Sequence, residues 1–317
     1  MTTHPWSTNV IGGVGTPRAV LCSGYNLVEN GTFEENLTGW EGFSASISRL
    51  PEITSPHGNA CLKVSDISAL TYGRARYTIY LINNSLTNIR NCSGKQFILT
   101  FYAKEGDADV GSHNTSVTLR DGLERNKQTS VFQVTTLGWK RVAIVLTCDY
   151  GNLNSDIVIE LGATENIMEQ GSTLYDKIEL YVVDNDYSFN IPERFGQNFE
   201  KILNYQRETW DGSIRSSIKG YRYNAELYYP FLEASQLQSW IEVSESSFCL
   251  FFPHSDHIFA TKVEWDGDFP YKYFKDKYLG HELTVKLRGM EIHTSKPTTI
   301  GTDLQQVRIA TDEYVII

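Results

Sequence analysis

The chain has 317 residues, of which 41% are hydrophobic and 12% aromatic, and it carries a formal net charge of -10. This length allows two domains of ordinary size, each with its own core. An acidic balance argues against a nucleic-acid partner, because such proteins neutralise phosphates with clustered Lys and Arg. No apolar stretch reaches about 18 residues, so we expect no insertion into a membrane.

The start of the chain and its cysteines give no sign of export or of covalent cross-links. No basic segment followed by an apolar one is visible, so we expect synthesis in the cytoplasm without a signal peptide. The five cysteines are scattered and show no C-x-x-C spacing. Neither a zinc site nor a disulfide framework is indicated, and each cysteine is expected to be a small buried hydrophobic residue.

Residues 1–24 are polar and rich in glycine, which predicts an extended arm outside any core. From Asn26 onward, short alternating segments recur between turn signals such as Asp121-Gly122. The clearest of these segments are 99–103, 116–120, 139–146, 157–161 and 177–183. Many short strands without a convincing helix predict an all-β jelly-roll sandwich over residues 25–185.

The pattern breaks near residues 185–200, where we place a domain boundary. Residues 186–295 combine alternating segments with one amphipathic helix, because Leu237, Trp240 and Ile241 stand at helical spacing within Glu233–Val243. This part is predicted to be a second β-sandwich with a short helix. The whole chain is therefore expected to be mainly all-β, with residues 296–317 forming a C-terminal arm.

The first domain carries landmarks in a fixed order. N-L-V-E-N-G-T-F-E and L-T-G-W come first, followed by H-G-N-A-C-L-K-V, F-I-L-T-F-Y-A-K, G-W and S-T-L-Y-D-K-I-E-L. In this order they resemble carbohydrate-binding modules of the cellulase and xylanase type, over about half of the chain. The residues alone predict a turn with positive φ at Asn30-Gly31 and a plug at the sandwich end formed by Phe33.

Two carboxylates within these landmarks are candidate metal ligands. Glu34 lies near the first strand of the domain and Asp176 near its last. Because the ends of a jelly roll lie together, the two side chains could converge on a hard cation with backbone carbonyls. The resemblance implies a structural Ca2+ at this pair. The other interpretation is that both are solvated or hydrogen-bonded acids.

The resemblance also implies aromatic rings that stack on sugar faces and polar side chains that bond sugar hydroxyls. The candidate platform residues are Tyr72, Arg74, Arg76, Tyr77 and Tyr102. For Tyr72 and Tyr102 the competing interpretation is a half-buried aromatic of a strand. Trp40 and Trp139 stand at landmarks that usually pack a core, so we expect them to be structural. The fold also serves adhesion and docking, so it does not by itself imply a bound glycan.

The second half carries a different ordered pattern. It begins W-D-G-S and G-x-R-Y, continues with the helix and an apolar strand at 248–253, and ends with W-x-G-x-F-P-Y-K-Y and a strand at 283–287. This pattern resembles a domain of bacteriophage tail-tube, tail-terminator and distal-tail proteins. The resemblance implies a ring in which edges and arms pair with the next subunit. The competing interpretation is an unrelated globular domain.

Signatures of common enzymes are missing, including G-x-S-x-G, the P-loop, H-E-x-x-H and the Rossmann fingerprint. His254, Asp256 and His257 form an H-S-D-H group in a predicted loop. No further metal-ligand run accompanies this group, so we expect solvated side chains there. Glycosidases need two carboxylates at a set separation, and no pair stands out among 38 acidic residues. We expect no catalytic function.

These patterns lead to one main hypothesis. The protein is expected to be a structural component of a bacteriophage tail or baseplate, located in the virion, with a C-terminal domain that forms a homo-oligomeric ring or binds other tail proteins. Its N-terminal module would contact a cell-surface glycan. The alternative is a free carbohydrate-binding protein or the non-catalytic part of a glycan-degrading system, and a third hypothesis is a glycosidase or lyase.

Overall fold

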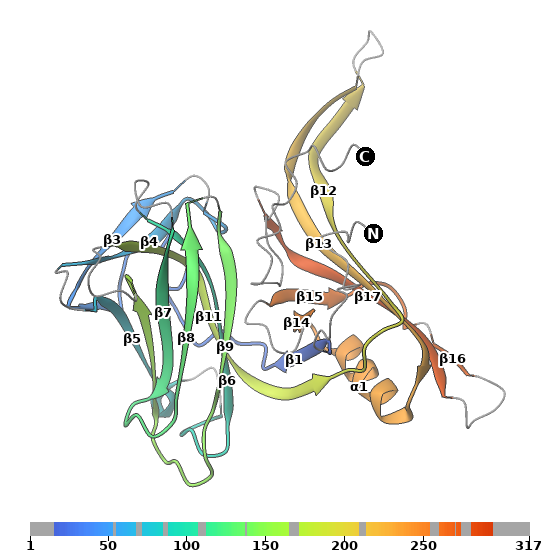
Figure 1. Ribbon diagram of the computed structural model, residues 1–317, viewed down its shortest axis with the longest axis horizontal. Helices are drawn as coiled ribbons and strands as arrows, with labels where there is room; N and C mark the ends of the chain where they lie inside the picture. Colours follow the sequence, from blue (N-terminus) through green and yellow to red (C-terminus); the bar gives the residue numbers. More distant parts are fainter. Residues whose placement is uncertain are drawn as a thin grey trace. The chain divides into compact units, whose positions relative to one another are not determined.

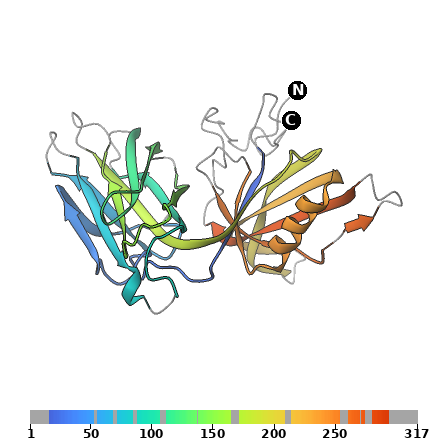
Figure 2. The same ribbon diagram turned by 90° about the horizontal axis from the view of Figure 1, so that it is seen from below.

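The computed structural model describes residues 16–52, 55–67, 72–84, 88–106, 112–136, 138–164, 171–208, 214–253, 260–269, 271–273 and 280–293. These residues form mainly β-strands with one α-helix, as the sequence predicts (Figures 1 and 2). The chain divides into two compact units. Ser23–Asp184 is named the sandwich unit, and Met1–Cys22 together with Asn185–Ile317 is named the split unit. The predicted arm at 296–317 lies outside the described residues.

The sandwich unit contains two antiparallel sheets. The first has the order β2 (Trp40–Phe43), β5 (Arg74–Tyr80), β10 (Asp156–Gly162), β7 (Ser112–Asp121) and β8 (Lys127–Thr135). The second has the order β3 (Ala45–Pro51), β4 (Ala60–Asp66), β11 (Ser172–Ser188), β6 (Gln96–Glu105) and β9 (Lys140–Thr147). A short 3-10 helix, η1 (Leu81–Asn83), follows β5.

The two sheets pack face to face around one core. The ring centroids of Phe101 on β6 and Phe132 on β8 lie 5.8 Å apart, which joins the two sheets. Phe33 is completely buried and packs on Trp40 at 5.6 Å between ring centroids, which agrees with its predicted role as a plug. The indole N–H of Trp40 donates to the carbonyl of Asn30 at 3.1 Å. Trp40 is therefore structural, as expected.

The turn at Asn30-Gly31 does not have the positive φ that the sequence predicts for it. The positive φ falls on Phe33, at 57°, rather than on Gly31. Gly31 is needed for a different reason, because a Cβ at this position would lie 2.0 Å from the carbonyl oxygen of Ile178. The amide of Ile178 donates to the carbonyl of Gly31 at 2.9 Å. The glycine therefore permits a close approach of two backbones.

The split unit is a sheet with a helix. The strand order is β12 (Arg194–Glu208), β13 (Ile214–Leu232), β17 (His281–His293), β15 (Thr261–Trp265), β14 (Cys249–Phe252) and β1 (Arg18–Cys22), and β16 (Tyr271–Tyr273) also pairs with β17. The helix is α1 (Ala234–Glu245). Its residues Leu237, Trp240 and Val243 are buried, and Trp240 stacks on Phe189 at 3.7 Å between ring centroids. No helix of the described residues is long and apolar enough to cross a membrane.

The last part of the predicted N-terminal arm is a strand in the structure. Arg18–Cys22 form β1, which pairs antiparallel with β14. Ala19 and Leu21 are buried in the core of the split unit, so this segment belongs to that core. The sequence did not indicate this, because five residues are too few to separate a strand from an arm and the partner strand lies far along the chain. The rest of the arm, residues 1–15, lies outside the described residues.

The β12–β13 hairpin extends beyond the part of β13 that pairs with β17. β17 pairs with β13 from Tyr221 to Leu232, whereas β12 pairs with β13 from Ile214 to Tyr228. β13 passes through Gly220 as one strand with a register shift, since Ile202 pairs with Gly220 but Leu203 pairs with Ile218. Beyond this shift the described hairpin continues as a two-stranded ribbon (Figure 1).

Candidate functional site

The outer face of the β2-β5-β10-β7-β8 sheet carries two of the predicted arginines. Along β5 the side chains alternate, and Ala75, Tyr77 and Ile79 are buried in the core. Arg74 and Arg76 therefore point to the opposite face. The cross-strand register places Glu160 of β10 beside Arg76. This face is the candidate site of the sandwich unit.

Glu160 is the centre of a charged network on this face. Its carboxylate accepts hydrogen bonds from Arg74 Nη1 at 3.0 Å, Arg76 Nε at 3.1 Å and Arg120 Nη2 at 2.9 Å. Burial opposes ionisation of Glu160, but the hydrogen bond from Arg120 and the charges of all three arginines outweigh it and lower the pKa of the carboxyl. Glu160 therefore stays ionised and positions the arginines, and it does not have the raised pKa of a general acid.

Exposed aromatic side chains lie on β2 and β5 or next to β5 in the sequence. Phe43 of β2 is 56% exposed, and the guanidinium of Arg76 lies 4.9 Å from the centroid of its ring. Tyr80 at the end of β5 and Tyr72, two residues before β5, are also exposed. Flat rings beside N–H donors can stack on a sugar face and bond its hydroxyl groups at the same time.

Two predicted platform residues do not share this surface. Tyr77 is buried and packs on Trp40 at 5.0 Å between ring centroids, and burial raises the pKa of its hydroxyl. Tyr102 lies on β6 of the other sheet, is 4% exposed, and has the guanidinium of Arg141 at 5.3 Å from its ring centroid. Contrary to the expectation, Tyr102 is thus separated from Tyr72, Arg74 and Arg76. Trp139 is half-buried and has Lys104 over its ring.

The two predicted metal ligands face the same turn. Asp176 is completely buried and accepts hydrogen bonds from Ser55 Oγ at 2.6 Å and from the amide of His57 at 2.9 Å. Glu34 accepts from the amides of Asn59 and Ala60, each at 3.1 Å. The turn between them needs a glycine at position 58, where φ is +71° and a Cβ would lie 2.2 Å from the Glu34 carboxyl carbon. Both carboxylates therefore accept hydrogen bonds from the same segment, residues 55–60, and their role as metal ligands stays a prediction.

The charges at this turn are incompletely compensated. Burial first, and the charge of Glu34 in addition, raise the pKa of Asp176 to about 7 against the opposing hydrogen bonds from Ser55, His57 and Lys177. Among the described residues neither carboxylate forms an ion pair with Lys or Arg. A cation between the two carboxylates would supply the missing charge, so the pair fits Ca2+ in charge and donor type.

The ligand set for such a cation is small. The described part of the chain contains no group of three or more His, Cys, Asp or Glu that could hold a metal ion. Ca2+ takes about six to eight oxygen ligands, so backbone carbonyls or water would have to complete the shell around Glu34 and Asp176. The H-S-D-H group of His254, Asp256 and His257 lies outside the described residues.

Comparisons with known proteins give a partial likeness to solved structures. The CBM22-1 xylan-binding domain from Paenibacillus barcinonensis Xyn10C aligns with 52% of this chain and 98% of that chain, at 17% identity and a TM-score of 0.40. The CBM22-1-GH10 modules of a Clostridium thermocellum xylanase align with 50% and 29%, at 14% identity and 0.37. A tailspike protein domain of Bacteriophage CBA120 aligns with 50% and 21%, at 15% identity and 0.34. No family description and no curated protein matches the sequence.

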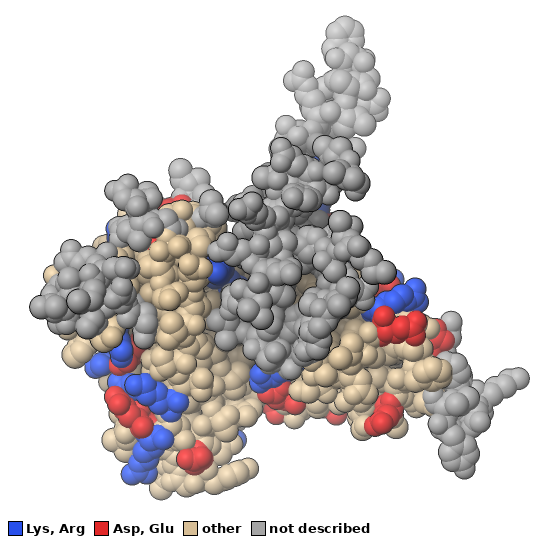
Figure 3. Space-filling model, viewed as in Figure 1, with Lys and Arg blue, Asp and Glu red and all other residues tan. Residues whose placement is uncertain are grey.

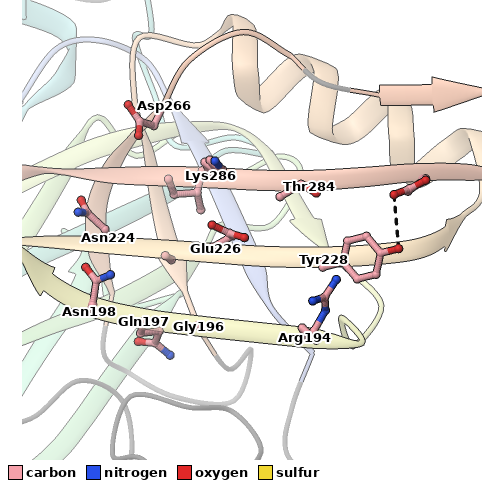
Figure 4. A pocket seen from close by; sticks show the side chains of 13 residues that line it. Arg194, Gly196, Gln197, Asn198, Asn224, Glu226, Tyr228, Asp266, Thr284 and Lys286 are labelled. Atoms are coloured by element: carbon pink, nitrogen blue, oxygen red, sulfur yellow. Dashed lines mark hydrogen bonds between the residues drawn. The ribbon is translucent and has the colours of Figure 1, made fainter.

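The split unit has a pocket on the outer face of β12, β13 and β17 (Figure 4). Side chains of both charges and several amides line it, and the hydroxyl of Tyr228 donates to Glu282 at 3.4 Å. The register places Glu226 beside Lys286, and Tyr228 beside Arg194. Opposite charges that alternate across strands are typical of a solvated sheet face, and we assign no ligand to this pocket.

Three residues of the candidate site were missed in the sequence: Phe43, Arg120 and Glu160. Arg120 was visible as the last residue of an alternating strand pattern, and Glu160 lies within another. What the sequence lacked was the register, because Glu160 meets Arg76 only through the pairing of β10 with β5. The alternation of β5 was readable, however, and it already separates Tyr77 from Arg74 and Arg76.

Proposed function

We propose that this protein is a structural component of a bacteriophage tail or baseplate and that its sandwich unit binds a glycan. The observation that carries the glycan proposal is the outer face of β2, β5 and β10, where the exposed ring of Phe43 lies beside the half-exposed guanidinium of Arg76. The sequence landmarks of carbohydrate-binding modules support the same assignment. Tyr72, Arg74 and Arg76 are the predicted contact residues that lie in or beside this face.

Replacing Phe43 by alanine should weaken glycan binding by about fivefold or more, because loss of a stacked ring removes about 1 kcal/mol. The measurement is a glycan array with the full chain, followed by calorimetric titration of each bound glycan. Tyr150→Ala is the matched control, since Tyr150 is 92% exposed but lies in the loop after β9. Unchanged binding by Phe43→Ala, or an equal loss in Tyr150→Ala, would contradict the assignment of this face.

The split unit supports the assembly part of the proposal. A two-stranded ribbon is only marginally stable by itself, yet in the described part of the chain β12 and β13 continue beyond their pairing with β17. The free edges of such a ribbon can pair with another chain. Together with the sequence pattern of tail proteins, this favours a homo-oligomeric ring within the virion and contacts with other tail proteins.

We expect light scattering with size-exclusion chromatography to give an oligomer, whose mass is several times the 36.0 kDa of one chain. Joining Leu203 to Ile218, which are register partners, through an Asn-Gly turn removes the far part of the hairpin and should yield monomers. Unchanged circular dichroism and glycan binding would show that the shortened protein is folded. A strictly monomeric wild-type protein would contradict the ring and favour a free carbohydrate-binding protein.

The Ca2+ role belongs to this proposal as well. Glu34 and Asp176 would hold the ion with backbone carbonyls or water, and the ion would fix the turn at Gly58 to the strand β11. Its contribution would be stability of the sandwich unit, since the outer face with Arg74 and Arg76 is formed by other strands.

A further inference from the structure

Three guanidinium groups share one buried carboxylate on the outer face of the sandwich unit. The side chain of Glu160 is 4% exposed, whereas those of Arg74 and Arg76 are 31% and 35% exposed. The carboxylate therefore lies beneath the arginines, and an incoming ligand meets the guanidinium groups first. Glu160 carries one negative charge and the three guanidinium groups carry three positive charges, so this cluster by itself has an excess of positive charge that can attract a negative group.

The arginines keep donors that the network does not use. Arg74 contacts Glu160 through Nη1 alone, at 3.0 Å, so its Nε and Nη2 are directed elsewhere. Arg76 uses Nε and Nη2, at 3.1 and 2.8 Å, which leaves Nη1. A guanidinium group presents five N–H donors in a planar fork, and this fork matches the two oxygens of a carboxylate. The contact with Glu160 holds the fork of Arg74 and the Nη1 group of Arg76 in place before a ligand arrives.

Acidic side chains limit the size of this basic site. Glu41 is the cross-strand neighbour of Arg76 and is exposed. Glu124 lies 3.5 Å from Arg120, and Asp156 is on the same strand as Glu160. On the face of the protein in Figure 3, basic and acidic side chains also stand beside one another. With a net charge of -10 for the chain, recognition of an anion must be local and directed, and a long polyanion track is not favoured.

We propose that the glycan bound by this face is acidic, and that a sugar carboxylate docks on the Nε–Nη2 fork of Arg74 and on Nη1 of Arg76 while a sugar ring stacks on Phe43. This inference rests on the proposed glycan-binding function and names the chemical class of its ligand. A neutral sugar would leave the outward N–H donors with hydroxyl groups only, whereas a carboxylate makes charge-assisted hydrogen bonds, which are about twice as strong.

The test is a glycan array that contains neutral glycans, uronate- or sialate-bearing glycans and the methyl esters of these acidic glycans. Esterification removes the charge and keeps the sugar backbone. We expect the full chain to bind acidic glycans at least about tenfold more tightly than their methyl esters, which corresponds to about 1.4 kcal/mol. Added salt should reduce this preference, because the contact is electrostatic and partly exposed.

Arg74→Gln keeps a polar side chain but removes the charge and the fork, so it should lower the preference for acid over ester to about one. Arg90→Gln is the charge-matched control, because Arg90 is exposed and bonds the carbonyl of Ile82 outside this face. Binding of neutral glycans or of esters with equal affinity would overturn the acidic ligand and leave the glycan function standing. Binding of no glycan at all would overturn both.

Discussion

Replacing Asp176 by asparagine should remove a loss of stability that the wild-type protein suffers as the pH rises. The pKa of Asp176 is raised from 3.8 to about 7, first by burial and further by the charge of Glu34. The unfolded chain releases this proton near pH 4, so the folded state holds more protons between pH 4 and 7. Stability must therefore fall as the pH rises through this window, by an amount on the order of 4 kcal/mol, and stay low above it.

The measurement is the thermal midpoint between pH 5 and 8 in the presence of EDTA, for the wild type and for Asp176→Asn. The midpoint of the wild type minus the midpoint of Asp176→Asn isolates Asp176 from all other titrating groups. This difference should become more negative as the pH rises, because only the wild type loses stability when Asp176 ionises. Glu41→Gln is the control, because Glu41 is exposed on β2. A constant difference over the whole range would contradict a buried, poorly compensated Asp176.

Adding Ca2+ to the same two proteins tests the proposed metal site. If Glu34 and Asp176 hold Ca2+, adding the ion at pH 8 should raise the midpoint of the wild type, because an ion that binds only the folded state stabilises it. Asp176→Asn should respond far less. An equal rise of the midpoint in both proteins would show that Glu34 and Asp176 do not hold Ca2+, and the pH prediction would still stand.

Replacing Trp240 by alanine should destabilise the split unit by about 3–5 kcal/mol. Trp240 is completely buried on α1, stacks on Phe189, and lies 6.1 Å from Tyr229 and 6.3 Å from Trp265 between ring centroids. The substitution removes the largest buried side chain of this core and leaves a cavity. The midpoint of the transition that belongs to the split unit should fall by roughly 10 °C or more.

Differential scanning calorimetry can separate this effect by unit. The transition of the sandwich unit should stay unchanged, since all aromatic partners of Trp240 belong to the split unit. Ile191→Ala is the control in the split unit, because Ile191 is 64% exposed and should change stability by less than about 0.5 kcal/mol. Equal shifts of both transitions would contradict two separate cores.

Local patterns predicted local features of the fold. The spacing of Leu237 and Trp240 predicted α1, and alternation predicted β6, β7, β9, β10 and β11 of the sandwich unit, because both are set by the period of the backbone. Pairing could not be predicted in the same way. β1 joins β14 through contacts between distant parts of the chain, and Gly31 is required by the approach of Ile178 rather than by its own conformation.

The candidate site was predictable to a similar degree. Glu34 and Asp176 were found through ordered landmarks, and they do meet at one turn. Arg74 and Arg76 were named as polar side chains that could bond sugar hydroxyls, but their partner Glu160 depends on register, which no local pattern carries. Tyr102 was placed with them by residue type alone, and the structure puts it in the opposite sheet.

The most direct test of the glycan-binding proposal is a crystal structure of the full chain with the tightest oligosaccharide from the array. We predict sugar density over β5 and β10, with a sugar oxygen bonded to Arg74 or Arg76 and a sugar ring against Phe43. An oligosaccharide bound anywhere else, for example in the pocket of β12, β13 and β17 or on the sheet that carries Tyr102, would contradict the assignment of this face.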